Sequence, residues 1–582
     1  WMIGRFPIVD ISPVIYFGGE FVGAKAIPHE SLPISATIVR EGHDGFVAEA
    51  LLFNPDGKEV QRVPMREIWP GTNRYEGWVK PLSVGNWSFQ IEVSADNPGE
   101  FKKRLASSSE RFPIKVERQR ALVGSWYEFF PRSEGAVKNG DGSITSGTFA
   151  TAAQRIPAVA AMGFDVLYIP PIHPIGYSHR KGKNNSLTST PTDPGVPWGI
   201  GNSAGGHDAI NPDLGTMADF LAFLKVAKKE KIEVALDLAL QCSPDHPWAK
   251  SNPEWFTKRA DGTIAYAENP PKKYEDIYPL NFDNDYPGLF AEVYRVVTFW
   301  IENGISIFRV DNPHTKPVHF WQELIAKVNA RSPDVVFLSE AFTTPAMMHS
   351  LGKAGFQQSY TYFTWRTTKD DLVNYGREVA TETSAFFRPN FWVNTPDILP
   401  FHLQSGNPAI FALRAVLAAT LSPSWGMYAG YELYEHLPIA EGKEEYRDSE
   451  KYEIKVRDWA GAEKKGLSLA PFITQLNEIR RENVALQRLR NLVFHQTDSP
   501  NVIAYSKREG DNLILVVVNL EGFHAQETTV NWDMWALGLN GESFAVTDLL
   551  DGKKYTWSQK TFVRLDPARP AGKVAHICRV KI

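Results

Sequence analysis

A carboxylate that directly follows an apolar run is the first residue able to do chemistry. Residues 305–316 read Ile-Ser-Ile-Phe-Arg-Val-Asp-Asn-Pro-His-Thr-Lys, and polarity changes abruptly at Asp311. This pattern is typical of a buried parallel strand that ends in a functional loop. Arg309 lies two residues earlier, so both side chains point to the same side of a strand. A guanidinium keeps a nearby carboxylate ionised, which makes Asp311 a candidate nucleophile, although a structural ion pair explains this motif alone equally well.

Further carboxylates close or interrupt apolar runs of the same kind. Glu340 and Asp397 each end such a run, and Asp237 lies inside another. Glycosyl transfer with retention needs a nucleophile and an acid/base about 5–5.5 Å apart, and a third carboxylate can hold sugar hydroxyls. Any one of these residues alone is more often a helix cap or a surface group. The set as a whole favours glycosyl chemistry.

A regular series of strands and helices must position these carboxylates. Apolar strand-like runs occur at 122–130, 165–169, 233–240, 305–311, 335–340, 359–363, 391–397 and 425–430. Amphipathic helical runs follow the first four, at 152–162, 217–228, 289–302 and 318–330. Eight strands in such a series predict an α/β fold, a (β/α)8 TIM barrel whose strand ends gather around one axis. The long loops 170–215 and 241–286 both follow strands, so we expect them on the catalytic face.

The barrel is expected between two β domains. Residues 1–97 contain alternating runs, the strongest at 86–93, and predict an N-terminal β-sandwich. The charged, serine-containing stretch 98–117 predicts a linker, and 118–488 the barrel, with a last helix at 468–483. Residues 489–582 predict a C-terminal β-sandwich, with its clearest strand at 513–520.

Composition excludes several classes of function. The net charge of −5 argues against a general nucleic-acid binder. No apolar run reaches the roughly 18 residues of a membrane-spanning helix. The only cysteines, Cys242 and Cys578, lie far apart, which fits a reducing, cytoplasmic compartment without a disulfide framework. No His/Cys/Asp spacing resembles a zinc site, so we predict no metal.

The order of these motifs resembles the α-amylase-like superfamily of glycoside hydrolases and transglycosylases. Its hydrolases usually carry Asp-x-x-x-Asn-His on the third strand and Asn-His-Asp on the seventh, whereas 237–242 read Asp-Leu-Ala-Leu-Gln-Cys and 395–397 read Thr-Pro-Asp. With Gly-Ser-Trp-Tyr-Glu-Phe-Phe-Pro-Arg-Ser at 124–133 and the segment 309–316, these departures closely resemble the bacterial α-1,4-glucan:maltose-1-phosphate maltosyltransferases. Those enzymes usually carry a helical-bundle insert near the end of the N-terminal sandwich, and the linker 98–117 is too short to hold it.

The resemblance implies a role for each candidate site residue. Asp311 would be the nucleophile, Glu340 the acid/base and Asp397 the transition-state stabiliser. A sugar phosphate carries about −1.5 to −2 charges, which suits lysines and neutral amides, although a loop lysine by itself is usually a solvated surface charge. The implied substrate-binding residues are Lys181, Gln241, Asp276, Asn312, Lys451 and Tyr452, with Asn269 and Tyr274 near the phosphate and Arg309 beside the nucleophile.

The implied activity is retaining transfer of a maltosyl unit from α-maltose 1-phosphate to the non-reducing end of an α-1,4-glucan. It would proceed through a maltosyl-Asp intermediate, without a cofactor, in a homodimer. Two alternatives stay open at this point. One is an amylase-like hydrolase or transglycosylase acting on neutral α-1,4-glucans, and the other is a catalytically silent glucan-binding protein.

Overall fold

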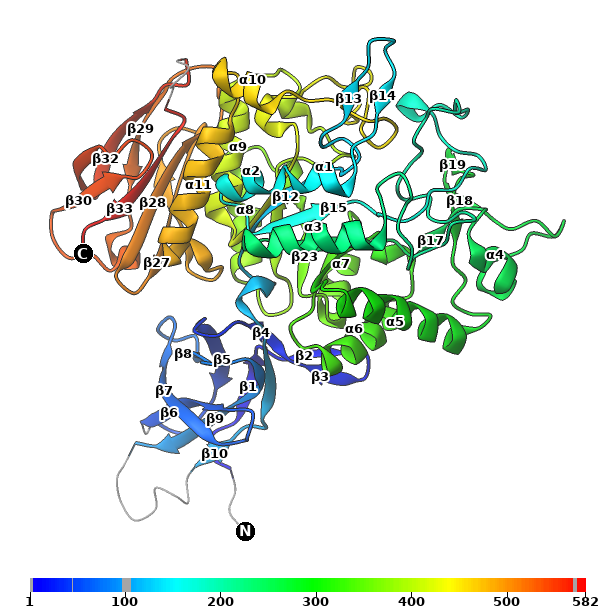
Figure 1. The fold of residues 1–582 in the computed structure, drawn as a ribbon. Coiled ribbons are helices and arrows are strands. Elements are labelled where there is room, and N and C mark those ends of the chain that lie inside the picture. Colours follow the sequence, from blue (N-terminus) through cyan, green and yellow to red (C-terminus); the bar gives the residue numbers. More distant parts are fainter. Residues whose placement is uncertain (1–3, 44, 97–105, 569–572) are drawn as a thin grey trace.

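The computed structural model describes residues 4–43, 45–96, 106–568 and 573–582, which form three successive regions of regular structure (Figure 1). The middle region is a closed, parallel, eight-stranded barrel, which confirms the predicted α/β TIM barrel. All but one of its strand residues are buried, as expected for strands covered on both faces. The strands, in order around the barrel, are β12 (Gly124–Glu128), β15 (Val166–Ile169), β16 (Glu233–Leu238), β21 (Ile307–Asp311), β22 (Val336–Glu340), β23 (Gln358–Tyr360), β24 (Pro389–Trp392) and β25 (Ser424–Tyr428).

Helices surround the barrel and lie close to the predicted positions. The run predicted as one helix at 152–162 forms two, because Pro157 lacks the N–H needed to continue a helix and instead occupies the first turn of the second. The helices of the barrel region are α1 (Phe149–Ala153), α2 (Ile156–Ala161), α3 (Met217–Lys229), α5 (Tyr286–Glu302), α6 (Val318–Arg331), α7 (Pro345–Ala354), α8 (Lys369–Ala380), α9 (Pro408–Leu421), α10 (Trp459–Lys464) and α11 (Ala470–Glu482). Among the described residues, no helix is long and apolar enough to cross a membrane.

The N-terminal region is a nine-stranded sheet around its own apolar core. Its strands are β1 (Ile8–Ser12), β5 (Leu32–Ile38), β8 (Arg74–Val79), β7 (Glu59–Glu67), β6 (Phe46–Phe53), β9 (Gly85–Ala95), β11 (Phe112–Val116) and β4 (Ala24–Ala26), with β10 (Ser107–Ser108) beside β9.

The structure differs from the prediction in the stretch 98–117. Residues 97–105 lie outside the described residues. The remainder contains β10 and β11, which pair with β9 and so belong to the sheet rather than to a linker. The reason is the alternation of β11, which buries Phe112, Ile114 and Val116 in the core of the sheet.

The C-terminal region is an eight-stranded sheet, and the predicted strand at 513–520 is its central β28. The strand order is β31 (Lys554–Ser558), β30 (Ser543–Asp548), β33 (Ala575–Val580), β28 (Asn512–Asn519), β27 (Val502–Glu509), β26 (Leu492–Thr497), β29 (Gln526–Asn531) and β32 (Lys560–Leu565). Helix α11 covers this sheet on the side of the barrel (Figure 1).

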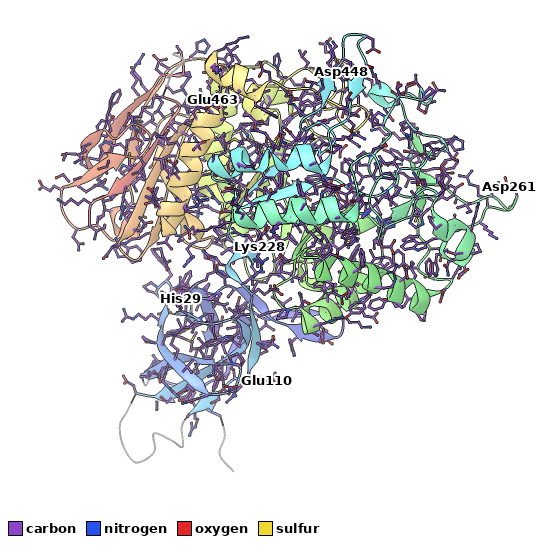
Figure 2. The ribbon with its side chains drawn as sticks, in the orientation of Figure 1. His29, Glu110, Lys228, Asp261, Asp448 and Glu463 are labelled. Carbon is purple, nitrogen blue, oxygen red and sulfur yellow. The ribbon has the colours of Figure 1, made fainter. Side chains whose placement is uncertain are left out.

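The two long loops add small elements of their own. Loop 241–286 contains β17 (Gln241–Cys242), α4 (Pro247–Ser251), β18 (Ala267–Asn269), β19 (Lys272–Tyr274) and β20 (Tyr278–Pro279). These elements lie at the end of the molecule opposite the C-terminal sheet (Figure 1), and Asp261 marks the outermost tip of the loop (Figure 2).

Two buried ion pairs, Arg388–Glu117 and Arg490–Glu30, form a polar seam that joins the three regions. Arg388 of the barrel donates to Glu117 of the N-terminal region at 2.8 Å, and both side chains are at most 5% exposed. Burial alone would raise the pKa of Glu117, but Arg388 and Lys25 outweigh it and lower the pKa to about 2. Arg490, which precedes the C-terminal sheet, forms a second buried ion pair with Glu30 at 3.1 Å.

Removing the charge of Glu117 is expected to destabilise the protein strongly. Glu117→Gln leaves Arg388 buried without a counter-charge, which typically costs about 3–5 kcal/mol. Because the folded-state pKa of Glu117 is depressed, its contribution is complete above pH 4.5 and is lost as pH falls toward 2. Thermal unfolding at pH 7 and at pH 3 measures both effects.

Glu59→Gln provides the matched control for this prediction. Glu59 pairs with Arg62 at 2.8 Å on the surface of the same region, where ion pairs contribute about 0–1 kcal/mol. Equal melting temperatures for the two variants would contradict a stabilising role for the buried seam.

Candidate active site

The carboxyl ends of three adjacent barrel strands bring together the residues predicted to converge. In the register of β21 and β22, Asp311 lies beside Glu340. In the register of β16 and β21, Asp237 lies beside Arg309. All four residues are less than 10% exposed. The predicted nucleophile and acid/base therefore occupy neighbouring strand ends at the mouth of the barrel.

The Arg309 guanidinium connects the carboxylates. Its Nη1 donates to Asp311 Oδ1 at 2.9 Å and to Asp237 Oδ2 at 3.1 Å. Its Nη2 lies 3.6 Å from Glu340 Oε2. The planar guanidinium can hold several carboxylates at fixed angles, which a lysine cannot. Arg309 thus orients the reactive groups and offsets their mutual repulsion.

Asp237 is held inside the barrel by groups from two other segments. Its Oδ2 accepts hydrogen bonds from the Tyr168 hydroxyl and, at 3.1 Å, from Trp198 Nε1. Burial raises the pKa of Asp237, and the nearby Arg309 opposes that rise. With so many partners on one oxygen, Asp237 is placed to position Arg309.

Glu340 is in an environment that favours its protonated form. Burial raises the pKa of Glu340, the Arg309 guanidinium opposes the rise, and the charges of Asp311 and Asp397 add to it. The net direction is well above the usual value for a glutamate. A carboxyl group that keeps its proton near neutral pH can act as a general acid.

Asn312 adopts a left-handed backbone conformation, with φ of 41°, directly after Asp311. Asparagine tolerates this conformation better than most residues. The turn aims the Asn312 N–H at Glu340, with distances of 3.1 Å to the carbonyl oxygen and 3.2 Å to Oε2. The backbone of Asn312 therefore links the ends of β21 and β22.

Asp397 was predicted to end the seventh strand, but the structure places it in the loop beyond. Strand β24 ends at Trp392, because the chain then turns and Thr395 bonds to Ile398 instead of to a neighbouring strand. The Asp397 side chain is 45% exposed and pairs with Lys451 Nζ at 2.5 Å. Surrounding protein would raise the pKa of Asp397, but Lys451 outweighs this effect and the pKa is lowered.

Lys451 and Tyr452, which were predicted to bind the donor, lie beside Asp397. The Lys451 ammonium lies 5.6 Å from the centre of the Trp198 ring and 5.7 Å from that of Tyr452, distances suited to cation–π contact. The backbone is fixed by Arg132, whose Nη2 donates to the carbonyls of Glu450 at 2.8 Å and of Lys451 at 3.1 Å.

A second contact ties the Lys451 segment to loop 170–215. The Asn184 side chain donates to Asp448 Oδ1 at 3.0 Å and accepts the Asp448 N–H at 2.7 Å. Asp448 lies at the edge of the molecule beside the β13 (Val137–Lys138) and β14 (Ile144–Thr145) hairpin (Figure 2). Loop 170–215 and the segment around Lys451 are far apart in sequence and are thus held together.

Lys181 and Asp276 line a small, partly open pocket. Lys181 is 5% exposed, yet among the described residues its ammonium has neither a hydrogen bond nor an ion pair. Asp276 Oδ1 is likewise buried without a hydrogen-bond partner. Burial raises the pKa of Asp276 and the charge of Lys181 opposes this rise. Both groups retain unused hydrogen-bonding capacity that a ligand could satisfy.

The remaining predicted residues belong to loop 241–286. Gln241 donates to the Trp198 carbonyl at 3.2 Å, next to the ring that faces Lys451. Asn269 and Tyr274 lie on the β18–β19 hairpin, and within the described part of the chain no hydrogen bond, ion pair or ring contact joins them to the other predicted site residues. Lys272 of this hairpin helps to lower the pKa of Asp397, so the hairpin borders the site.

Four residues near the catalytic centre were absent from the predicted site. Tyr168 and Trp198 bind Asp237, and burial raises the pKa of Glu128, an effect that Arg309 opposes. Arg132 is the fourth. Glu128 and Arg132 belong to segment 124–133, which the sequence analysis noted only for its family resemblance. Trp198 lies in a loop, and no local sequence pattern predicts its contact with Asp237.

A buried cluster of His207, Cys242 and His246 has the composition of a metal site. However, Nε2 of His207 donates to the Ala239 carbonyl at 2.7 Å, and Nδ1 of His246 accepts the Trp248 N–H at 3.0 Å. The two remaining ring nitrogens bond to each other at 3.0 Å. A metal would have to replace these bonds, so the geometry supports the prediction of no metal here.

A second such cluster, in the C-terminal region, contains Asp548, His576 and Cys578. Asp548 pairs with His576 at 2.8 Å and with Lys573 at 2.6 Å. These ion pairs satisfy the carboxylate from within the protein. The absence of a metal requirement remains a prediction.

Comparison with known protein families finds a matching family model at each end of the chain. Residues 4–118 match the family model described as "Alpha-1,4-glucan:maltose-1-phosphate maltosyltransferase, domain N/S". Residues 494–580 match the model described as "GLGE, C-terminal". Among solved structures, a cyclomaltodextrinase aligns with a TM-score of 0.63 at 14% identity over 96% of this chain and 98% of its own. An α-amylase from Geobacillus thermoleovorans aligns with a TM-score of 0.60 at 16% identity over 79% and 98%.

Full-length relatives are considerably more similar. Alpha-1,4-glucan:maltose-1-phosphate maltosyltransferase 1 of Streptomyces coelicolor is 49% identical, covering 100% of this chain and 96% of the relative. The enzyme of that name from Mycobacterium tuberculosis is 45% identical over 99% and 96%. The alignment with the Streptomyces relative spans 655 positions, more than the 582 residues here, so that relative has residues with no counterpart in this chain. Identity at this level over the whole length shows that the chain belongs to the α-1,4-glucan:maltose-1-phosphate maltosyltransferase family of glycosyltransferases.

Proposed function

We propose that this enzyme transfers a maltosyl unit from α-maltose 1-phosphate to the non-reducing end of an α-1,4-glucan, with retention. The observation that carries the proposal is the Lys181 side chain on the loops that border the proposed catalytic carboxylates: it is 5% exposed, lines a small pocket with Asp276, and within the described residues its ammonium makes no hydrogen bond or ion pair. The Lys181 ammonium and the buried Asp276 Oδ1 both lack hydrogen-bond partners within the described residues, so they are suited to a ligand with complementary groups. The donor named for the relatives supplies such groups through its phosphate and hydroxyls.

In the first step, an Asp311 oxygen attacks the anomeric carbon of the donor. A bond forms between that oxygen and the carbon, while the bond from the carbon to the phosphate oxygen breaks. Arg309 holds Asp311 Oδ1 at 2.9 Å and thereby fixes the carboxylate for attack. Glu340, which retains its proton, can pass it to the departing phosphate.

In the second step, the terminal hydroxyl of an α-1,4-glucan replaces Asp311 on the anomeric carbon. Glu340, now ionised, takes the hydroxyl proton as the new glycosidic bond forms and the ester breaks. Two inversions at one carbon give overall retention. Asp397 is proposed to hold sugar hydroxyls during both steps, with Lys451 fixing its orientation at 2.5 Å.

Donor recognition is assigned to the groups around Lys181. Lys181, Asp276 and Gln241 would bind sugar hydroxyls or phosphate, because each offers hydrogen-bonding capacity near Trp198 or the small pocket. Asn312 and the Lys451–Tyr452 pair would complete the site beside the nucleophile. Asn269 and Tyr274 are proposed to approach the phosphate from the β18–β19 hairpin.

Incubation with maltose 1-phosphate and maltohexaose tests the proposed function directly. Release of phosphate together with growth of the acceptor by two glucose units supports it. Reducing sugar produced from maltohexaose alone would favour an amylase-like hydrolase. Asp311→Ala is expected to abolish turnover in a folded protein, and retention of a tenth of the rate would exclude Asp311 as the nucleophile.

Glu340→Ala is expected to accumulate the covalent intermediate. Phosphate needs less acid assistance than a sugar alkoxide because its second pKa is about 6, so the first step slows without Glu340 but still proceeds. Attack by a sugar hydroxyl in the second step gains about 10²–10⁴-fold from a general base. Intact-protein mass spectrometry after addition of maltose 1-phosphate should show one added maltosyl group. The adduct should be absent from the Asp311→Ala, Glu340→Ala double variant. An adduct formed from maltohexaose but not from the phosphate donor would contradict the proposal.

Lys181→Met is expected to weaken use of the donor. Loss of a hydrogen bond from a charged group raises the donor KM by about tenfold or more with little change in kcat, if the contact is equal in the ground and transition states. Lys183→Met is the matched control, because Lys183 lies two residues away and is exposed. Equal KM values for both variants would remove Lys181 from the donor site.

The pH dependence of kcat/KM for the donor is expected to report Glu340. Its raised pKa means that the acid form persists at neutral pH and is lost as pH rises, so activity should fall on the alkaline side. The Glu340→Gln side chain does not titrate in this range, and the kcat/KM of this variant for the donor should be lowered and should lack this alkaline limb. An unchanged limb in Glu340→Gln would assign the titration to another group, such as Asp237, whose pKa is also raised.

A further inference from the structure

The C-terminal region displays an aromatic side chain that no described residue covers. Trp535 in α12 (Met534–Leu537) is 91% exposed, more than any other large apolar side chain in the described part of the chain. Exposing the apolar ring of an indole to water is unfavourable in free energy, so the ring is a candidate contact for a ligand. This region lies at the end of the molecule opposite the loops that carry β17–β19 (Figure 1).

The exposure of Trp535 is imposed by a rigid support. Trp532 is 1% exposed, stacks on Trp557 with ring centres 6.0 Å apart, and donates to Thr561 Oγ1 at 3.2 Å. Leu537 on the other side of the short helix is also buried. With Trp532 and Leu537 buried in the core, the backbone of the short helix is held in place and presents Trp535 to solvent.

A shallow groove of about 710 Å³ adjoins this tryptophan, between α8 and the sheet. Three amide side chains line it, Gln496, Asn531 and Gln559, and in the register of β26 and β29 the first two lie side by side. Within the described residues, none of the three side chains has a hydrogen-bond partner. Each amide offers both donors and an acceptor, which suits ligands rich in hydroxyl groups.

The charged residues of the groove are largely occupied within the protein. Lys369 Nζ donates to the carbonyls of Thr497 at 3.2 Å and Ser499 at 3.1 Å. The Asp533 carboxylate caps α12 by accepting the Ala536 N–H at 3.0 Å. Arg377 lies over the Phe494 ring at 5.8 Å. The groups left for a ligand therefore include neutral amides and an aromatic face, together with the exposed side chains of Asp370 and Arg377 on α8.

A second exposed aromatic residue extends this surface. Phe562 is 64% exposed on β32, where it pairs with Thr529 of β29, while Asn531 of β29 pairs with Lys560. Residues two apart on a strand share a face, so Phe562 lies on the same face as Asn531. Exposed aromatic side chains thus flank a row of amides, an arrangement that matches the alternating apolar faces and hydroxyl edges of a sugar chain.

We propose that this groove binds a chain of α-1,4-glucan at a site separate from the active site. One glucose ring would stack on Trp535, and the amides would bind hydroxyls of neighbouring units. This inference rests on the proposed function, because the glucan is the polymer that the enzyme would extend. Binding at the end remote from the catalytic loops would keep a polymeric acceptor attached between transfers.

Native gel electrophoresis with and without glycogen tests the proposal without any donor or turnover. Trp535→Ala should weaken the apparent affinity for glycogen by about threefold to tenfold, the range that loss of one aromatic contact gives. Trp535→Phe should retain part of the affinity. Phe523→Ala is the matched control, since Phe523 is 53% exposed in the same region outside the groove, and it should bind glycogen normally.

Two further measurements separate this proposal from its alternatives. The kcat/KM for maltohexaose should stay within about twofold of the wild-type value in Trp535→Ala, since a short acceptor gains little from a remote site. Glycogen retardation equal to wild type would overturn the proposal, and so would an altered oligomeric state with unchanged glycogen binding, which would assign Trp535 to a protein contact. Because the gel needs no chemistry, failure of the proposed activity would be seen separately.

Discussion

The guanidinium of Arg309 offsets the repulsion among the carboxylates at the mouth of the barrel. It lies between Asp237, Asp311 and Glu340, which come from three different strands. The positive charge of Arg309 allows the carboxylates to lie close together. Their negative charges in turn allow the guanidinium to be buried. The cluster therefore depends on the register of the three neighbouring strands β16, β21 and β22, which places Asp237 beside Arg309 and Asp311 beside Glu340.

Trp198 connects this cluster to the loops that are proposed to bind the donor. Its indole N–H bonds to Asp237, its ring faces the Lys451 ammonium, and its carbonyl accepts from Gln241. One side chain from loop 170–215 thus contacts the barrel, loop 241–286 and the Lys451 segment. Because Trp198 contacts all of these parts, a displacement of one part would displace the others. This coupling explains how long loops can form a defined site.

The sequence allowed the barrel and its central pair of carboxylates to be predicted, because buried parallel strands leave local apolar runs and the residue after each run is held at the mouth. Asp311 and Glu340 are of this kind. Asp397 was placed less well, since a turn after Trp392 has no apolar signal. Strand β11 was missed because its alternation is short and interrupted by charge. The contacts of Trp198 and the unpartnered state of Lys181 depend on how distant loops meet, which no local pattern encodes.

The position of the polar seam has a consequence for how this family can vary. Glu117 and Glu30 fasten the N-terminal sheet to the rest of the protein. Strand β10 and the adjoining end of β9 lie at the opposite end of that sheet, away from the barrel (Figure 1). Chain inserted between β9 and β10 would extend outward without touching the seam. A change in the length of this connection would therefore leave the Glu117 and Glu30 ion pairs in place.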